Sequence, residues 1–405
     1  AIARGGNIAL GKITAAAQTM NQVIHNIHAT HGGRNRVGLQ HIALHNFNLL
    51  QPRTALKARG ITVTAVTKAV CGHPKIAQAM LEGGAVDLGE ARVSNVKRLR
   101  GPGIKTPITL IRTPLLSQAD LVVGSCSASY NSEVEVIARL AEAARKTKFV
   151  HSIMLMVEMG DMRDGIMPEN VEAIARQVTA MPGVTVRGIG ANFACLSGTA
   201  PTTSKMNDLS AIASHIEQTY GILIPVISGG NSANLPLALG QHSGGRINNL
   251  RLGEVILLGV EPVSGEKING LFTDAFTLIT EVIEAKSKPV LTKALFTDPA
   301  LQALRLVPDN NHAMRSILAI GKQDTDISGL TLPKGVTCLG ATSDHMVIQS
   351  IRSHPRVGSA LKLQMNYSAL MRAMNAPDIT KVILNETPFK KRSSAHRDGP
   401  DVALV

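Results

Sequence analysis

The stretch VTAVTKAVCGHP, residues 63–74, places one lysine within a run of small and β-branched apolar residues. Such a run predicts a buried strand that ends at Lys68. An unpaired ammonium group is costly to bury, so this lysine must be paired, shifted in pKa or used covalently. The alternative is a lysine whose stem lies along the protein while its ammonium group reaches solvent at the strand end.

The chain on both sides of this stretch alternates short apolar runs with amphipathic helical segments. The runs predict strands at 61–68, 85–89, 107–112, 121–126, 151–158, 186–193, 224–229 and 247–253. Helical periodicity is found over 74–84, 132–146, 168–181, 204–221 and 232–240. Eight parallel strands with intervening helices predict an α/β fold, a (β/α)8 TIM-type barrel. Lys68 would lie at the carboxyl-terminal end of that barrel, where barrel enzymes carry their catalytic groups.

The pattern changes after about Leu271 to apolar runs separated by turn residues, which predicts a mostly β C-terminal domain with one short helix near Tyr367–Met374. The expected organisation is an N-terminal segment (1–60), the barrel (61–270), the β domain (271–385) and a disordered tail (386–405). In the N-terminal segment, residues 7–20 and 41–54 begin alike, which indicates a short repeat, an insertion or a coincidence.

The composition argues against several classes of protein. Aromatic residues make up 2% of the 405 residues and Trp is absent, so the core must be aliphatic and nucleic-acid binding by base stacking is disfavoured. The net charge of +13 suits an anionic partner or a cofactor phosphate, or serves solubility. The four cysteines are widely spaced without a CxxC pair, which indicates a reducing, cytoplasmic location. The sequence contains no run of about 18 apolar residues, so no membrane-spanning helix is predicted.

Two further motifs follow the last predicted strands of the barrel. ISGGNSAN, residues 227–234, combines two glycines with Ser232 at a helix start, which is how a backbone turn binds phosphate. The loops after strands seven and eight are the usual phosphate site of this fold. RLGE, residues 251–254, places Arg251 at the same end. The alternatives are a plain glycine-rich turn and a structural salt bridge of Arg251.

The order and spacing of the motifs resemble those of the alanine racemase fold type of pyridoxal-phosphate enzymes (fold type III), and most closely the branch of ornithine racemases and related amino-acid racemases. The motifs include VTAVTKAVCGHPKIAQAMLEGG, SYNSEVEVI, MVEMGDMRDGI, GIGANFAC, ISGGNSANLPL, NNLRLGEVILLG, ILAIGKQDTDISGL and LQMNYSALMRAM. The resemblance covers roughly residues 41–385. It implies a barrel with a β domain, pyridoxal 5'-phosphate as cofactor, an amino acid as substrate and a homodimer with shared active sites.

The resemblance also implies roles for individual residues. Lys68 resembles the lysine that holds the cofactor covalently, and burial would keep its amine neutral and nucleophilic. Arg251 resembles the arginine that faces the pyridine nitrogen, and Arg163 the arginine that supports the substrate side. The remaining cofactor-binding positions are Asn192, Ser228, Asn231, Ser232, Gly253 and Glu254.

Racemisation needs a proton donor or acceptor on each face of the substrate carbon. Lys68 would serve one face, and in alanine racemases a tyrosine from the partner's β domain serves the other. The corresponding glycine-rich turn is missing here, and Tyr367 is the sole tyrosine of the predicted β domain. Tyr367 is therefore the candidate, with a core tyrosine as the alternative. Asp344, next to His345, is a substrate-side candidate that is equally explained as a turn residue.

The predicted function is a pyridoxal-phosphate-dependent amino-acid racemase, with ornithine- or lysine-like substrates favoured by the resemblance. A metal-assisted D-amino-acid lyase is one alternative, because Asp344 and His345 lie in the β domain where such a lyase holds its metal. Adjacent residues of a strand point to opposite faces, however, so no metal ligand set is predicted. A non-catalytic pyridoxal-phosphate-binding protein is the other alternative.

Overall fold

The computed structural model describes residues 41–44, 50–240, 244–294, 305–350 and 355–383. The chain divides into two compact units, and the boundary between them falls between Ala275 and Phe276. Residues 41–44 belong to the unit that contains Phe276 onward, because they pair with its strands. The first copy of the possible repeat, 7–20, and the tail 386–405 lie outside the described residues.

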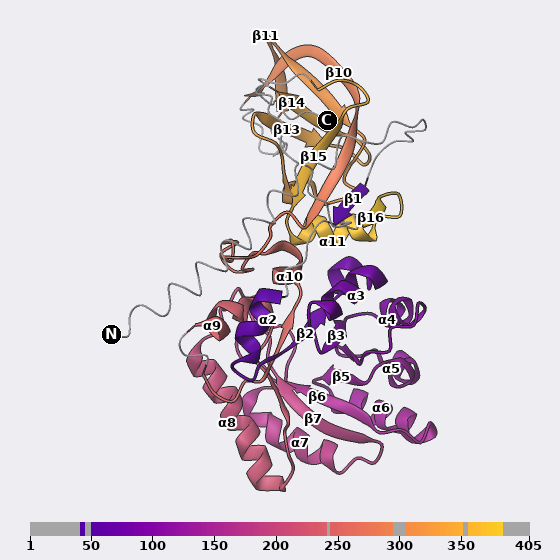
Figure 1. Cartoon of the computed structure of the whole chain (residues 1–405), viewed down its shortest axis with the longest axis vertical. Helices are drawn as coiled ribbons and strands as arrows, with labels where there is room; N and C mark the ends of the chain where they lie inside the picture. The colour runs from indigo at the N-terminus through magenta and orange to yellow at the C-terminus, as the bar shows by residue number, and fades with distance from the viewer. Residues whose placement is uncertain (1–40, 45–49, 241–243, 295–304, 351–354, 384–405) are drawn as a thin grey trace, which may run out of the picture. The chain divides into compact units, whose positions relative to one another are not determined.

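The first unit is a closed barrel of eight strands, in the order in which they occur in the sequence (Figure 1). The strands are β2 Thr62–Val66, β3 Asp87–Glu90, β4 Ile108–Leu110, β5 Ala128–Asn131, β6 His151–Met156, β7 Val184–Gly190, β8 Val226–Ser228 and β9 Asn249–Leu252. Each pairs in parallel with the next, and β9 pairs with β2 to close the barrel. The predicted (β/α)8 barrel is confirmed.

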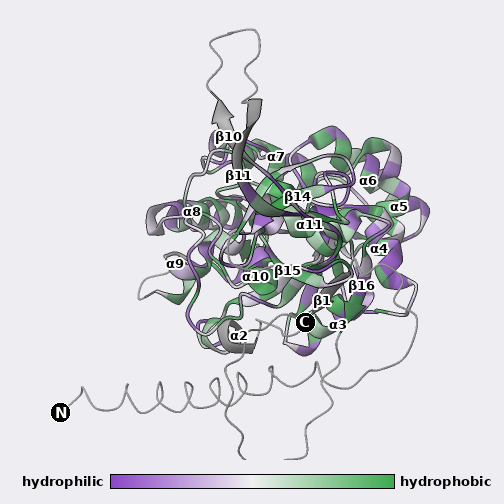
Figure 2. Cartoon of the chain, turned by 90° about the horizontal axis from the view of Figure 1, so that it is seen from above, coloured by the Kyte–Doolittle hydropathy of each residue, from purple (hydrophilic) through white to green (hydrophobic). Residues whose placement is uncertain are grey.

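Helices lie outside the strands of this barrel (Figure 1). They are α2 Leu50–Lys57, α3 Pro74–Glu82, α4 Val93–Arg100, α5 Ala119–Ser125, α6 Val134–Lys146, α7 Val171–Thr179, α8 Thr203–Tyr220, α9 Leu235–Leu239 and α10 Glu254–Leu258. Short 3-10 turns occur at η2 Lys68–Val70, η3 Leu116–Gln118, η4 Pro168–Asn170 and η5 Ser232–Asn234. Figure 2 shows hydrophobic and hydrophilic residues side by side on α4, α5 and α6, as expected for helices that bury one face.

The strand predicted at 121–126 is wrong. LVVGS lies in α5, which ends just before Cys126, and the barrel strand is the following segment ASYN of β5. A short apolar run does not distinguish a strand from a half-buried helix, and Leu121 is exposed while Val122 is buried. The polar residues of β5 are buried because they hydrogen-bond to each other: the Ser129 hydroxyl lies 2.9 Å from His151 Nε2, and Asn131 donates to Ser129.

The barrel core is aliphatic, as the composition predicts. Among the described residues, the largest side chains with almost no exposed surface are leucines, isoleucines and Met80, together with Phe193. Tyr130 lies inside the barrel in a cluster with Met154 and Met156. The pattern of β2, with one exposed residue followed by four buried ones, brings the chain from solvent through this core to its carboxyl-terminal end.

The second unit is a mostly β domain, as predicted. Its sheet has the order β12-β15-β10-β11-β14-β13, and β1 joins β10 antiparallel and β16 parallel. The elements are β1 His41–Leu44, β10 Phe276–Ala294, β11 Arg305–Leu318, η6 Ile327–Gly329, β12 Leu330–Thr331, β13 Val336–Ala341, β14 Met346–Ser350, β15 Ala360–Met365, α11 Tyr367–Asn375 and β16 Thr380–Ile383. Helix α11 lies where the short helix was predicted. Within the described ranges, no helix is both long and apolar enough to cross a bilayer.

Candidate active site

Lys68 stands at the carboxyl-terminal end of the barrel, which we call the barrel mouth. Strand β2 ends at Val66, and the chain turns at once into η2, which begins with Lys68. The turn then passes through Cys71 and Gly72, both in the left-handed region with φ of 54° and 60°. A Cβ on Gly72 would lie 2.9 Å from the carbonyl oxygen of Asn95, so this turn requires glycine.

The ammonium group of Lys68 has a lowered pKa. Solvent reaches the side chain, yet surrounding protein makes desolvation the largest cause of the shift. The cations Arg163 and Arg251 lower the pKa further, whereas Cys195 and Glu90 act in the opposite direction. The lowered pKa shifts Lys68 toward its neutral, nucleophilic form.

Two carboxyl groups with raised pKa values lie within electrostatic range of Lys68. Glu90 ends β3, is 0% exposed, and burial raises its pKa to about 7 although Asn95 donates a 3.1 Å hydrogen bond to it. Burial likewise raises the pKa of Glu254 to about 7, and Glu261 adds to the shift. Glu90 was not predicted from the sequence, and Glu254 was predicted only as a cofactor-binding position. Glu90 is the last residue of β3, and Lys68 lies just after the end of β2. This shared position at the carboxyl-terminal ends of neighbouring strands could have indicated Glu90 as a site residue.

Arg251, on β9, is a buried cation with neutral partners. It is 4% exposed, and its Nη1 donates to Ser228 Oγ at 2.7 Å while its Nη2 donates to the Ala191 carbonyl at 2.7 Å. Weaker bonds reach the Tyr130 hydroxyl at 3.3 Å and Asn192 Oδ1 at 3.5 Å, and the guanidinium lies 4.6 Å from the centre of the Tyr130 ring. Its Nε–H has no partner among the described residues. The alternative of a structural salt bridge is therefore wrong for Arg251.

Ser232 links the loops that follow β8 and β9. Its hydroxyl accepts hydrogen bonds from the amides of Gly253 at 3.2 Å and Val255 at 3.3 Å. The preceding turn is made by Gly230, with φ of 107°, where a Cβ would lie 2.7 Å from the Phe193 ring. One hydroxyl and two backbone N–H groups thus gather at one point, and groups of these kinds bind phosphate in proteins.

Asp161 joins the loops that follow β6 and β7. Its Oδ1 accepts from the amides of Cys195 at 2.8 Å and Leu196 at 3.0 Å, and its Oδ2 accepts from Asn192 Nδ2 at 3.0 Å. Desolvation acts to raise the pKa of Asp161, but these amides and Asn192 lower it below its ordinary value. Arg163, two residues on, pairs with Asp164 at 2.6 Å.

Asn231 connects this group to the Ser232 turn. Its side chain donates to the Phe193 carbonyl at 2.7 Å and to Cys195 Sγ at 3.2 Å, and accepts from the Ala233 amide. The barrel mouth thus brings together nine of the residues expected at the site: Lys68, Arg163, Asn192, Ser228, Asn231, Ser232, Arg251, Gly253 and Glu254.

The other two candidates belong to the second unit. Tyr367 is the first residue of α11, whose N-cap Asn366 accepts from the Ala369 amide, and Tyr367 itself is half-buried. Asp344 is exposed and bonds to its neighbours, with the Ser343 hydroxyl at 2.8 Å and His345 Nδ1 at 3.3 Å. These contacts form the local turn that the sequence analysis gave as the alternative for Asp344.

Comparison with known proteins identifies the family. The family described as alanine racemase, N-terminal domain, matches residues 39–262. The chain belongs to the alanine racemase family. An ornithine racemase from Acetoanaerobium sticklandii is 32% identical over 330 residues, which cover 80% of this chain and 93% of the relative. A lysine racemase from Thermotoga maritima is 34% identical, and the match covers 80% of this chain and 91% of the relative.

Solved structures agree with this membership at the level of the fold. An alanine racemase from Streptomyces lavendulae has a TM-score of 0.65 at 17% identity, covering 87% of this chain and 99% of that structure. A histidine racemase from Leuconostoc mesenteroides has a TM-score of 0.63 at 17% identity, covering 87% of this chain and 100% of that structure. Across the ranges that the structure describes, no three His, Cys, Asp or Glu side chains are grouped as metal ligands.

Proposed function

We propose that the protein is an amino-acid racemase, an isomerase that uses pyridoxal 5'-phosphate. The observation that carries the proposal is the amine of Lys68, whose lowered pKa occurs at the same barrel mouth as buried Arg251 and the Ser232 turn. The racemase relatives, matched over 80% of this chain, support the same activity.

The residues at the barrel mouth fit the three reactive parts of pyridoxal phosphate. An aldehyde needs a neutral amine, which the lowered pKa of Lys68 favours. A phosphate needs a hydroxyl and backbone N–H groups, which Ser232 and the residues from Gly253 to Val255 provide. A ring nitrogen needs a hydrogen-bond partner, for which Arg251 retains its Nε–H. When bound, this cofactor supplies an electron sink that acidifies the α-proton of an amino acid.

Residues of the protein itself would transfer the proton, contact the ring nitrogen and bind the substrate carboxylate. Lys68 Nζ would hold the α-proton on one face of the substrate carbon, because burial lowers its pKa and so shifts it toward the proton-accepting amine. Arg251, always charged, would keep the ring nitrogen unprotonated. Arg163 would bind the substrate carboxylate, with Asp161 fixing the loop that carries it.

The opposite face requires a second proton-transfer group. Tyr367 is our candidate for that role, with Asp344 on the substrate side. Tyr367 is half-buried and stands at the start of a helix fixed by the Asn366 cap, which suits a hydroxyl held in one position. In this proposal two copies of the chain form a homodimer with shared sites, which the molecular mass in solution and subunit-mixing experiments would test.

The favoured substrates are ornithine, lysine or a similar basic amino acid. The names of the ornithine and lysine racemases that match this chain support this choice. The four cysteines, all within the described residues, form no disulfide, which supports a cytoplasmic location.

The decisive experiment incubates the purified holoprotein with single amino acids in deuterated water and analyses the products on a chiral column. Racemisation by two groups gives α-deuterium together with inversion for ornithine or lysine. Exchange without inversion would instead indicate a single proton-transfer group. An aldehyde product would establish the lyase, and a stable chromophore without any exchange would establish the non-catalytic binding protein.

A further inference from the structure

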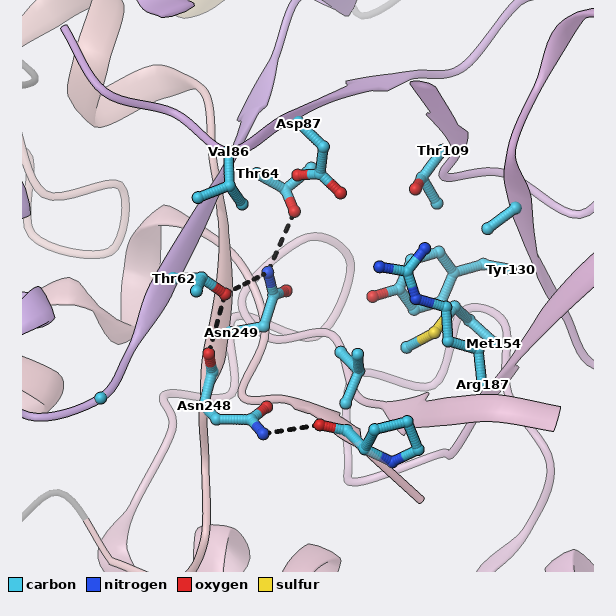
Figure 3. Close-up of a pocket in the computed structure, with 14 residues that line it drawn as sticks. Thr62, Thr64, Val86, Asp87, Thr109, Tyr130, Met154, Arg187, Asn248 and Asn249 are labelled. Atoms are coloured by element: carbon cyan, nitrogen blue, oxygen red, sulfur yellow. Dashed lines mark hydrogen bonds between the residues drawn. The ribbon is translucent and has the colours of Figure 1, made fainter. Parts of the chain in front are cut away.

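A second polar cavity lies within the barrel at the end opposite Lys68, which we call the barrel foot. Its volume is about 280 Å³. Its polar lining includes Thr62 and Thr64 of β2, Asp87 of β3, Thr109 of β4, Arg187 of β7 and Asn249 of β9 (Figure 3). A volume just below the roughly 300–1,000 Å³ of pockets for drug-sized ligands limits any occupant to a small molecule.

The charges of this cavity are balanced and incompletely paired. Asp87 and Arg187 face the same space in Figure 3, and Arg187 acts electrostatically on Asp87. In the described chain the two form no direct ion pair, and the Arg187 guanidinium has no hydrogen-bond acceptor. Oδ1 of Asp87 is buried without a hydrogen-bond partner. One carboxyl group and one guanidinium therefore retain unused hydrogen-bonding capacity.

A directed hydrogen-bond chain makes Asp87 an acceptor. Arg251 can only donate, so Ser228 Oγ accepts from it at 2.7 Å and passes its own hydrogen to Asn249 Oδ1 at 2.8 Å. Asn249 Nδ2 in turn donates to Thr64 Oγ1 at 3.0 Å, as drawn in Figure 3. The Thr64 hydroxyl is then free to donate its hydrogen to Asp87. Desolvation raises the pKa of Asp87, and this hydrogen bond from Thr64 partly opposes the rise.

We propose that this foot cavity binds the zwitterion of a small α-amino acid, with the ammonium group at Asp87 and the carboxylate at Arg187. A net-charged ligand would leave one of the two protein charges unpaired, whereas a zwitterion satisfies both. The apolar part of the lining, which includes Met154, Val226 and the Tyr130 ring, would contact the ligand's side chain. The proposal does not depend on racemase activity.

The test is titration calorimetry with the full chain, using L-alanine, L-leucine and L-ornithine as probes. The Lys68→Ala/Arg163→Ala variant removes binding at the barrel mouth and should retain one bound probe per chain. Arg187→Gln in that background should weaken binding by at least about tenfold, because a charge-assisted bidentate contact is lost. Leucinamide, which lacks the carboxylate, and 4-methylpentanoate, which lacks the ammonium group, should both fail to bind.

Other results would overturn the proposal. Binding that disappears with Lys68→Ala/Arg163→Ala would place the amino acid at the mouth alone. Binding that is unchanged by Arg187→Gln would also exclude the foot. No heat with any probe would mean that the cavity holds water only. A second variant, Asp87→Asn, removes the other charge and should also weaken binding. If it fails to fold by circular dichroism, Arg187→Gln still decides, because the Arg187 side chain is partly exposed and makes no hydrogen bond among the described residues. A cofactor chromophore with no foot binding would refute this inference and leave the proposed function intact.

Discussion

The two ends of the barrel carry charge in different ways. At the mouth, the cations Arg163 and Arg251 lie with the amine of Lys68, whose pKa is lowered, and with the Asp161 carboxylate, whose pKa is also lowered. The carboxyls of Glu90 and Glu254 have raised pKa values of about 7, which leave them only partly ionised near neutral pH. At the foot, one acid and one base share a cavity. The mouth thus combines several charged groups of both signs with shifted pKa values, while the foot has one acid and one base and suits a ligand without net charge.

The two ends also differ in how they are built. The mouth residues Lys68, Arg163, Asn231 and Ser232 come from turns and loops after strands, whereas Arg251 comes from a strand. At the foot, Thr64, Asp87, Arg187 and Asn249 all belong to the strands themselves. Loop residues can adopt the unusual turns that bring backbone N–H groups together, and strand residues hold a fixed spacing with little freedom. The chemistry therefore belongs to the mouth, and substitutions there should have the largest effects.

The largest effect is expected for Lys68→Ala. Loss of the amine removes the covalent link to the cofactor and one proton-transfer group, so racemisation should fall by at least about 10³-fold. The visible absorbance of the holoprotein should shift at the same time. Lys75→Ala, at an exposed position on α3, is the matched control and should behave like wild type. An unchanged spectrum for Lys68→Ala would refute the assignment.

A smaller effect is expected for Arg251→Lys. The charge is kept, but an ammonium group cannot bond to Ser228 Oγ, the Ala191 carbonyl and the ring nitrogen in the planar arrangement of a guanidinium. Turnover should fall by roughly 10²-fold, with the protein still folded and cofactor-bound. Arg246→Lys, at an exposed ion pair with Glu217, is the control. Equal activity of the two variants would remove Arg251 from the site.

Ser232→Ala should weaken cofactor binding by about tenfold, with a smaller effect on turnover of the saturated protein. The reason is the loss of one hydroxyl, worth roughly 1–1.5 kcal/mol, from the group that contacts Gly253 and Val255. Equilibrium dialysis of the cofactor measures the change. Ser94→Ala, exposed on α4, serves as the control. A loss of turnover without a change in binding would show that the phosphate lies elsewhere.

A different kind of effect is expected for Glu90→Gln, which should change the pH dependence of stability. Burial raises the pKa of Glu90 from 4.5 to about 7 in the folded protein. Between these values the unfolded chain releases the proton and the folded chain keeps it, so wild type loses stability as pH rises from about 4.5 to 7.

The glutamine variant should not show this loss, and its stability relative to wild type should increase across that window by up to roughly 3 kcal/mol. Urea unfolding at a series of pH values measures the difference. Glu82→Gln, exposed on α3, controls for the loss of one surface carboxylate. Parallel pH profiles of the Glu90→Gln variant and wild type would exclude this role of burial.

Much of the mouth could be predicted from the sequence, because its residues follow apolar strands and include glycines that mark special turns. Lys68 and the loop around Ser232 were found in this way. Strand β5 was missed because its polar residues are buried by hydrogen bonds with His151 and each other, which no single-sequence pattern reveals. Glu90 was missed because its significance lies in burial and in its distance from Lys68.

The foot cavity was missed for a related reason. Alternation in TVTAV indicates which threonines share a face, but the cavity depends on the side chains that the seven other strands of the barrel place opposite them. The division between Ala275 and Phe276, and the pairing of residues 41–44 with β10 and β16, depend equally on contacts between distant segments.

The side chain of Asn249 is hydrogen-bonded to residues of both barrel ends, so its magnetic resonance signals should report on both. Its Oδ1 accepts from Ser228, and its Nδ2 donates to Thr64 at 3.0 Å and Thr62 at 3.3 Å, so one buried carboxamide accepts from the mouth side and donates toward the foot. Its two N–H protons should exchange slowly with solvent and give well-resolved nuclear magnetic resonance signals. A ligand at either end would disturb the same pair of signals, which makes this side chain a built-in reporter for the whole barrel interior.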